Sequence, residues 1–324
     1  MFDYNEELDQ KLIAIADKGA NSVRMNIYDV NLDTGEFDVI DNARSILGLA
    51  GYRVNGILTK DGEGKLLTVL KEFLSIANSL PVDMFVSFAT ASLRGLNNAR
   101  DIVNRIYREL GIKVEIISGI RESVLDRIAI RERFKVPVLT PSCVIDMGGG
   151  STELASFTGS KNGPAISLPF GSLALSKRFF KDPLYPTDEE FDAITKHVNR
   201  MLYSNPKFRN CAITAYIIGG TGRAIARTVY FLDDEKDKST DGKVLTVAKY
   251  VGAAKALCFG PKHDKLISRA CPDRKESIIA GAMAMQCIMK YIGAEKVIVS
   301  SAGVREGYLS DLIQTMRNEN ETNF

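Results

Sequence analysis

The strongest chemical signal in the sequence is a glycine-rich turn that directly follows a short apolar run. The turn consists of Asp146, Met147, Gly148, Gly149, Gly150, Ser151 and Thr152. Three consecutive glycines let the backbone approach a phosphate group closely, and the successive amides of such a turn can form an anion-binding concavity. The two hydroxyls add donors, and the aspartate at the strand end is placed to hold a magnesium ion. A plain hairpin rarely needs three glycines and two hydroxyls, so we interpret this segment as a phosphate-binding turn.

A weaker turn of the same type lies near the N-terminus and contains Asp17, Gly19, Asn21 and Ser22. Taken alone it is ordinary, because Asp-x-Gly turns are common between strands. It gains weight because it repeats the order of strand, acidic residue, glycine-bearing turn and strand. Two such turns that face each other across a cleft would grip one phosphate chain from both sides. We therefore expect phosphate contacts from Gly19, Asn21 and Ser22, with Asp17 and Asp146 at a shared metal ion.

A third glycine-rich turn runs from Gly219 to Gly222, between a strand-like and a helix-like segment. Amides at a helix N-terminus favour a phosphate group, which makes Gly220 and Thr221 candidate contacts, although a tight connection would look the same. The turn lacks the Gly-Lys-Ser/Thr ending of the P-loop and the glycine spacing of the dinucleotide fingerprint. Both of those nucleotide-binding folds are therefore disfavoured.

Two glutamates and one arginine are candidates for the remaining chemistry. Glu122 and Glu153 are placed for acid or base work, because hydrolysis of a phosphoanhydride needs a carboxylate to orient and deprotonate water. Glu122 also suits a plain first-turn position, where the helix dipole favours an acidic residue, and the residues alone slightly favour that structural role. Arg94 follows a strand, where α/β folds place ligands, and would either clamp phosphate oxygens or cap a helix.

Strand-like and helix-like patterns alternate along the chain and position these residues. At 324 residues the chain exceeds the size at which one hydrophobic core stops growing, so two domains are expected. Pro137 marks the candidate crossing between them. Strands are predicted at 11–16, 23–30, 37–40, 84–89, 114–117, 142–145, 153–157, 165–168, 215–218 and 296–300, and helices at 64–79, 98–110, 122–134 and 274–291, from 173, from 188 and from about 305.

Composition excludes several classes of function. Forty-two basic and 40 acidic residues give a formal charge of +2, so no broad positive field indicates nucleic-acid binding. The five cysteines are scattered and predict neither a disulfide framework nor a zinc site. Of the two histidines, His197 is predicted on the solvated face of a helix and His263 in a loop, which leaves serine-hydrolase and His-rich metal chemistry without their usual residues. The acidic N-terminus and the lack of a long apolar run predict a cytoplasmic protein without a membrane partner.

Six blocks carry a family resemblance when they are taken together and in order. They are DKGANSVRMNIYDV, FATASLRGLNNA, VEIISGIRESVL, VIDMGGGSTELASF, IIGGTGRAIAR and VIVSSAGVREGYL, which extend from about residue 13 to 309. This set resembles the exopolyphosphatase and guanosine pentaphosphate phosphohydrolase family of the actin-like ATPase superfold. The resemblance implies an α/β protein with two actin-like (ribonuclease H-like) domains, each a mixed five-stranded sheet flanked by helices, and a cleft between them. The expected limits are 1–134 with about 305–324 for the first domain and 135–304 for the second.

The resemblance also implies roles for the candidate residues. By motif position, Glu122 resembles the catalytic base of the family and Glu153 its second cleft carboxylate. For Glu122 the resemblance therefore favours a catalytic role, whereas the residues alone slightly favour a structural one. Asp17 and Asp146 resemble its metal-associated aspartates, and Arg94 its phosphate-contacting arginine. Three residues depart from the pattern: Lys18 and Ala20 in the first turn, where a positive charge is gained and a hydroxyl lost, and Arg121, a cation that would lower the pKa of the neighbouring base.

The leading expectation is an enzyme that uses Mg²⁺ or another divalent cation to release terminal orthophosphate from polyphosphate, with guanosine pentaphosphate as the runner-up substrate. The chain resembles the short, two-domain type, because a C-terminal helical extension does not fit after residue 309. A non-catalytic sensor of guanosine tetraphosphate or pentaphosphate is one alternative, and a small-molecule kinase of the same superfold is another. No nucleic-acid partner is expected, and a homodimer stays open.

Overall fold

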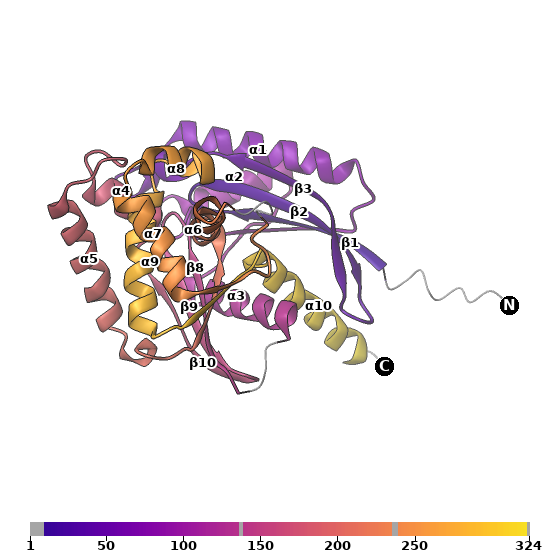
Figure 1. The fold of residues 1–324 in the computed structure, drawn as a ribbon. Helices are drawn as coiled ribbons and strands as arrows, with labels where there is room; N and C mark the ends of the chain where they lie inside the picture. The colour runs from indigo at the N-terminus through magenta and orange to yellow at the C-terminus, as the bar shows by residue number, and fades with distance from the viewer. Residues whose placement is uncertain (1–9, 136–138, 235–238, 323–324) are drawn as a thin grey trace. The chain divides into compact units, whose positions relative to one another are not determined.

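The structure is a computed structural model that describes residues 10–135, 139–234 and 239–322. The chain forms two compact units, the first made of Met1–Ser118 with Tyr308–Phe324 and the second of Gly119–Gly307 (Figure 1). The sequence predicts a domain boundary after residue 134. The contacts instead group helix α3 (Gly119–Phe134) with the second unit, because this helix packs on strands of the second sheet.

The first unit is built on a five-stranded mixed sheet in the order β3-β2-β1-β6-β7. Strands β1 to β3 form an antiparallel meander, while β6 is parallel to β1 and β7 is parallel to β6. The elements are β1 (Gln10–Lys18), β2 (Ser22–Asn31), β3 (Phe37–Ile46), a 3-10 turn (Leu49–Tyr52), the short pair β4 (Arg53–Val54) and β5 (Ile57–Leu58), α1 (Lys60–Asn78), β6 (Met84–Ala89), α2 (Ala99–Leu110), β7 (Glu115–Ile116) and α10 (Val304–Thr322).

Alternation along β1 divides the first unit into two layers around its sheet. Ala14 and Ala16 face a core that is completed by apolar residues of α1 and α2. On the other face, Phe88 of β6 stacks on Tyr308 of α10, with ring centroids 5.0 Å apart. Helix α10 therefore packs on this face of the first sheet.

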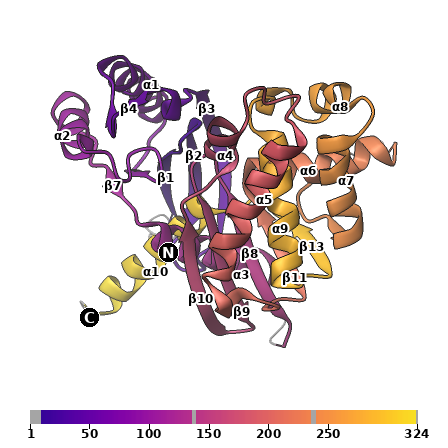
Figure 2. The ribbon, with the colours of Figure 1, turned by 90° about the vertical axis from the view of Figure 1, so that its left-hand side faces the viewer.

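The second unit is built on a six-stranded sheet in the order β10-β9-β8-β11-β13-β12 (Figure 2). Strands β8 to β10 are antiparallel, β11 is parallel to β8 and β13, and β12 is antiparallel to β13. The elements are β8 (Pro141–Met147), β9 (Thr152–Thr158), β10 (Lys161–Leu168), α4 (Ser172–Phe179), α5 (Asp188–Tyr203), two 3-10 turns (Pro206–Phe208 and Pro272–Arg274), β11 (Thr214–Ile218), α6 (Gly219–Leu232), β12 (Val244–Thr246), α7 (Val247–Phe259), α8 (His263–Ala270), α9 (Ile278–Ile292) and β13 (Lys296–Val299).

The expectation of five strands in the second sheet is wrong by one edge strand. Strand β12 has three residues, of which only Leu245 is buried, so it is too short to show a periodic pattern. Thr246 also caps helix α7, because its side chain accepts a hydrogen bond from the Lys249 amide. The sequence signal at this point is therefore that of a helix start.

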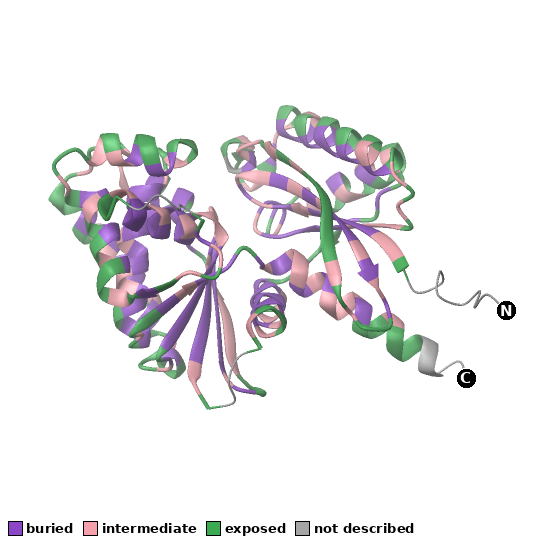
Figure 3. Ribbon diagram, turned by 45° about the vertical axis from the view of Figure 1, so that its right-hand side comes forward, coloured by how far each residue is buried: buried purple, intermediate pink, exposed green. Residues whose placement is uncertain are grey.

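The second sheet is covered on both faces. Cys143, Ile145 and Met147 of β8 face the large core formed with α4 to α9, whereas Val144 faces a smaller core shared with α3. Buried residues follow the strands of this sheet and the facing sides of its helices (Figure 3). No helix among the described residues combines the length and apolar character needed to cross a membrane.

Both histidines lie elsewhere than predicted. His197 is buried between the rings of Phe170 and Phe179, with centroids 6.4 and 5.3 Å away, rather than on a solvated helix face. Its helix begins at Asp188, as predicted, and a capping box between Thr187 and Glu190 stabilises the first turn. His263 opens helix α8 instead of lying in a loop. Neither histidine is adjacent in the sequence to a candidate phosphate turn. The hydrogen bonds that the structure shows for the two imidazoles go to residues outside those turns.

Candidate functional site

The glycine turn between β8 and β9 is held in shape by the start of helix α4. The amides of Ser172 and Ala174 donate to the carbonyl oxygens of Gly148 and Gly149, both at 2.9 Å. In a trans peptide the N–H points opposite to the C=O. The amides of Gly149 and Gly150 therefore both point away from α4, and two neighbouring amides with one direction form the kind of concavity that binds an anion.

Gly171 makes this contact between the turn and α4 possible. A Cβ atom at this position would lie 2.5 Å from the carbonyl carbon of Gly149 and 2.6 Å from the Gly150 nitrogen. Any side chain here would push the turn away from the helix. Sequence reasoning does not identify Gly171, because its importance comes from a backbone contact with residues more than 20 positions earlier.

Two carboxylates flank the turn. Asp146, at the end of β8, and Glu153, at the start of β9, are direct partners in the antiparallel pairing. Their side chains project on the α3 face of the sheet, since Val144 and Ala155, two residues along each strand, lie in the α3 core. The hydroxyl of Ser167 donates to Oε1 of Glu153 at 2.6 Å, and Glu153 is buried.

Helix α3 brings Glu122 to the same end of the sheet. Arg131 donates to the carbonyl of Gly159, just past the far end of β9, and Arg127 donates to the carbonyl of Ser156, nearer the middle of β9, and to that of Gly163 in β10. Since four residues advance a helix by about 6 Å, the first turn of α3 lies level with the glycine-turn end of β9. Glu122, buried in that first turn, is thus on the face and at the end of the sheet that carry Asp146 and Glu153.

The start of α6 meets the same aspartate. Gly219 has a φ of +76°, and a Cβ atom on it would lie 2.1 Å from Oδ1 of Asp146. A Cβ atom on Gly220 would lie 1.7 Å from a terminal nitrogen of Arg274. Burial lowers the pKa of Arg223, the neighbouring Arg305 lowers it further, and the Asp146 carboxylate acts in the opposite direction.

These arginines were not identified from the sequence. The signal that was available is Arg223, which directly follows the third glycine turn. Arg274 and Arg305 come from other elements and reach the site only through the fold. Together they place positive charge beside Asp146 at the glycine-rich end of the second unit.

Two predicted phosphate ligands use their hydroxyls inside the protein. Thr152 donates to the carbonyl of Phe170 at 2.7 Å, and Thr221 donates to the hydroxyl of Ser172 at 3.2 Å. Both threonines are buried. These bonds hold the glycine turns at 146–152 and 219–222 against the start of α4. Contact of either hydroxyl with phosphate stays a prediction.

In the first unit, the turn after β1 is closed by a hydrogen bond from the Gly19 amide to the carbonyl of Ser22, at 3.0 Å. The Asn21 carbonyl accepts from the amides of Leu47 and Gly48, so this turn is also anchored to the segment after β3. The Ser22 hydroxyl accepts from Nε of Arg24 at 3.3 Å. The structure thus gives the weaker motif a defined backbone shape.

Arg94 lies at the same edge of the first sheet as this turn. The Thr90 amide donates to the carbonyl of Lys18, and the Arg94 amide donates to the carbonyl of Thr90. The Arg94 guanidinium donates to the carbonyl of Ile117, beyond β7. The structure therefore brings Asp17, Gly19 and Arg94 to the carboxyl ends of the parallel strands, where α/β proteins bind ligands.

The expected extra charge of Lys18 is not on the surface of the turn. Lys18 is fully buried, and its ammonium group donates to the hydroxyl of Ser87 and to the carbonyl of Phe88. Burial lowers its pKa to about 7, against the opposing effect of Asp17. Because neighbouring strand residues alternate in direction, Lys18 faces the core while Asp17 faces the other side of the sheet.

The donor chemistry of the second unit suits a hard cation. Among the described residues, no three His, Cys, Asp or Glu side chains gather as a metal cage. Asp146 and Glu153 instead offer an adjacent pair of carboxylates. This fits Mg²⁺, which is usually bound by one or two carboxylates together with water and substrate phosphates.

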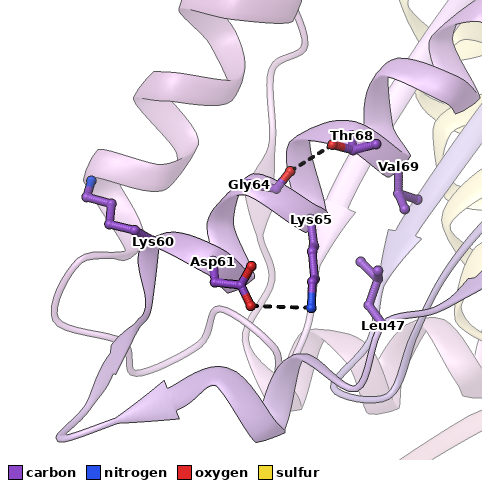
Figure 4. Close-up of a pocket in the computed structure, with 7 residues that line it drawn as sticks. All are labelled: Leu47, Lys60, Asp61, Gly64, Lys65, Thr68 and Val69. Carbon is purple, nitrogen blue, oxygen red and sulfur yellow. Dashed lines mark hydrogen bonds and ion pairs between the residues drawn. The ribbon is translucent and has the colours of Figure 1, made fainter.

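A separate hollow of about 400 Å³ lies on the first unit beside helix α1 (Figure 4). An exposed ion pair between Lys65 and Asp61, with the charged atoms 3.3 Å apart, forms part of its wall. None of the predicted catalytic, phosphate-binding or metal-binding residues lines it. It is not part of the candidate site.

Comparison with known proteins agrees with this geometry. The sequence model of the Ppx/GppA phosphatase family matches residues 30–316. Exopolyphosphatase 1 of Mycobacterium tuberculosis is 24% identical over 310 residues, which cover 92% of this chain and 87% of the relative. The bifunctional 3-dehydroquinate synthase/phosphatase of Fusobacterium nucleatum is 25% identical over 302 residues, 89% of this chain and 45% of the relative.

Solved structures show the same fold. The Ppx/GppA family member of Aquifex aeolicus has a TM-score of 0.76 and 28% identity, with 95% of this chain and 99% of that chain covered. An exopolyphosphatase from Cytophaga hutchinsonii has a TM-score of 0.84 and 21% identity, with 94% and 98% covered, which is evidence for the fold alone. The predicted fold class, two actin-like α/β domains with mixed sheets flanked by helices, is confirmed. The chain belongs to the Ppx/GppA phosphatase family.

Proposed function

We propose that this protein is an exopolyphosphatase, which releases terminal orthophosphate from inorganic polyphosphate. The observation that carries the proposal is the placement of Glu122, Asp146 and Glu153 on one face and at one end of the second sheet, next to a turn with two parallel amides. Hydrolysis of a phosphoanhydride needs an anion-binding site for the transferring phosphoryl group and a carboxylate that activates water. The name of the mycobacterial relative supports polyphosphate as the substrate.

In this proposal Glu122 is the general base. It takes a proton from the attacking water as the water oxygen bonds to the terminal phosphorus, and the bridging P–O bond breaks. The products are orthophosphate and a polyphosphate chain one unit shorter. Glu153, fixed by Ser167, is the second carboxylate of the site and limits where the water and the phosphoryl group can lie.

The terminal phosphoryl group binds at the turn from Gly148 to Thr152, with Gly220 of the third turn beside it. In the first unit, we propose Gly19, Asn21, Ser22 and Arg94 as further phosphate-binding residues. Arg223 and Arg274, near the start of α6, add positive charge that favours a polyanion over a simple phosphate ester.

We further propose Mg²⁺, or another divalent cation, as the cofactor. Asp17 and Asp146 are the residues that would hold such a cation, directly or through water. When bound, the cation neutralises charge on the phosphoryl oxygens. The protein residues then orient the water and accept its proton.

The test is orthophosphate release from polyphosphate of defined length, in magnesium and in excess chelator, by the wild type and Glu122→Gln. Loss of a general base lowers the rate by roughly 10²–10⁴-fold. Glu132→Gln is the matched control, because Glu132 is an exposed glutamate on the same helix. Equal release by wild type and Glu122→Gln would show that Glu122 is not the general base.

The same assay separates the remaining functions. Faster release from guanosine pentaphosphate than from any polyphosphate would identify that nucleotide as the main substrate. Binding of guanosine tetraphosphate or pentaphosphate without turnover would identify a sensor. Production of ADP that requires a small acceptor would identify a kinase.

A further inference from the structure

A short series of hydrogen bonds links two glycine turns of the second unit, those at 146–152 and 219–222. The hydroxyl of Thr221 donates to the hydroxyl of Ser172 at 3.2 Å, and the hydroxyl of Ser172 donates to the carbonyl of Gly148 at 3.3 Å. The amide of Ser172 donates to the same carbonyl at 2.9 Å. We refer to these bonds, from Thr221 through Ser172 to Gly148, as the hydroxyl relay. Ser172, the first residue of α4, is thus bonded to both turns.

The carbonyl at one end sets the direction of the hydroxyl relay. A carbonyl oxygen only accepts, so the single hydroxyl proton of Ser172 goes to Gly148, and the Ser172 oxygen accepts from Thr221. The hydroxyl proton of Thr221 is therefore used inside the protein. The oxygens of an ionised phosphate group also accept hydrogen bonds, so the Thr221 hydroxyl has no proton to offer them while the relay is intact. The relay favours a positioning role for Thr221 over the direct phosphate contact expected from the sequence.

The two hydroxyl-bearing side chains are enclosed. Ser172 and Thr221 are each 1% exposed. Helix α9 packs directly on both, because a Cβ atom on Gly281 would lie 2.5 Å from Cγ2 of Thr221 and 2.9 Å from Cβ of Ser172. Buried hydroxyls keep their hydrogen-bond partners, since an unsatisfied polar group is costly away from water. The relay is therefore a fixed part of the folded second unit.

The hydroxyl relay acts on two sets of backbone amides that suit an anion. At one end, two donors from Ser172 fix the carbonyl of Gly148 and with it the direction of the Gly149 amide, since both belong to one planar peptide. At the other end, Thr221 lies in the first turn of α6, directly after Gly220, where free amides favour a phosphate group. The relay thus sets the position of one group of amides relative to the other.

We propose that Ser172 is a positioning residue which, with Thr221, holds the two turns at a fixed separation, so that they bind neighbouring phosphoryl groups of one polyphosphate as a unit. This inference rests on the proposed hydrolysis of polyphosphate. In this role neither hydroxyl touches the substrate. Because the two hydroxyls act through one shared hydrogen bond, loss of either has the same consequence as loss of both, and the effects of the two substitutions are not additive.

The experiment is a double-mutant cycle on orthophosphate release from polyphosphate of defined length. We expect Ser172→Ala and Thr221→Val each to lower kcat/KM by roughly 2–10-fold, as for the loss of one neutral hydrogen bond. The double variant should lose no more than either single variant. Thr221→Ser keeps the hydroxyl and should recover the wild-type value. Ser176→Ala, at another buried serine one turn further along α4, is the matched control and should leave kcat/KM unchanged.

Unfolding of the same proteins in urea gives a second cycle, which needs no substrate and should show the same lack of additivity. Losses of kcat/KM that multiply in the double variant would mean that Thr221 acts independently of Ser172, as a direct phosphate contact does, and would overturn the proposal. A wild-type kcat/KM for Ser172→Ala, or additive losses of stability, would overturn it as well. If the wild type itself releases no orthophosphate, the proposed function is wrong, and the unfolding cycle still decides whether the relay joins the two turns.

Discussion

The hydroxyl of Ser167 donates to Oε1 of Glu153 at 2.6 Å, across the pairing of β9 with β10. The two residues are direct partners in the register, so the bond is set by the sheet itself. A hydrogen bond to a charged group of this kind fixes the carboxylate in one orientation. Ser167 is therefore a positioning residue for the second carboxylate of the proposed site.

Ser167→Ala should lower kcat by roughly 10–100-fold, because a hydrogen bond to a charged group contributes about 1.5–3 kcal/mol. KM for polyphosphate should change little, since the hydroxyl acts on Glu153 rather than on the substrate. Ser167→Thr keeps the hydroxyl and should recover most of the activity. Ser160→Ala, at an exposed position in the β9–β10 turn, is the control. A rise in KM with unchanged kcat would show that Ser167 has another role.

The sequence marks the candidate residues of the site but not the contacts that hold them in place. The glycine turn and its aspartate stand out because the signal is local: residue types and spacing within one hairpin. No local pattern in the sequence points to Ser167, Gly171 or Arg274, because each acts through a contact with a distant segment.

The errors in the fold have similar causes. His197 lies on a helix whose periodicity is right, but the sequence does not show that Phe170 and Phe179, which precede the helix, cover that position. The sequence pattern assigns Lys18 to the turn, as an added positive charge, because it stands next to a glycine. In the structure β1 continues through residue 18, and strand alternation turns this side chain into the core.

Gly171→Ala should disrupt the glycine turn directly. The added methyl group would meet the backbone of Gly148 to Gly150 at 2.5–2.6 Å, and backbone atoms cannot move aside as a flexible side chain can. We expect a stability loss of about 1–3 kcal/mol, typical of overpacking, together with a loss of phosphatase activity. Urea unfolding and phosphate release measure the two effects.

Gly252→Ala is the matched control for that substitution. Gly252 lies in helix α7 with no atom within 4 Å of the added Cβ, so alanine should stabilise the protein by about 0.5–1 kcal/mol. Its activity should stay at the wild-type level. If Gly171→Ala behaved in the same way, the close packing of the turn against α4 would be needed neither for stability nor for activity.

His197 should make the protein less stable in mild acid. Burial lowers the pKa of His197 below the ordinary value of 6.5, and the neighbouring Arg178 and Arg200 lower it further. Below pH 6.5 the unfolded chain therefore binds more protons than the folded chain, and stability falls as the pH falls toward the folded pKa. His197→Phe, which suits the space between two phenylalanine rings, should remove this part of the acid sensitivity.

The measurement is the free energy of unfolding in urea at pH 8 and pH 5 for both proteins. The difference between wild type and His197→Phe should shift in favour of the variant at the lower pH. His263 is present in both proteins and cancels from the comparison. A parallel loss of stability in the two proteins would mean that His197 titrates normally in the folded state.

Gly219→Ala should displace the Asp146 carboxylate. A methyl group at this position would lie 2.1 Å from Oδ1 of Asp146, so either the carboxylate or the start of α6 must move. If Asp146 holds the proposed Mg²⁺, the concentration of magnesium that gives half-maximal activity should rise, and the maximal rate should fall. Phosphate release over a magnesium titration measures both quantities.

The substitution also strains the backbone, because the φ of Gly219 is +76° and alanine there costs about 1–2 kcal/mol. Gly242→Ala separates the two effects: Gly242 has a φ of +73°, with no atom within 4 Å of an added Cβ. Both variants should lose similar stability from the strained backbone, but only Gly219→Ala should need more magnesium. The same magnesium requirement in both would mean that the Asp146 carboxylate does not hold the cation, since its displacement would then leave the metal affinity unchanged.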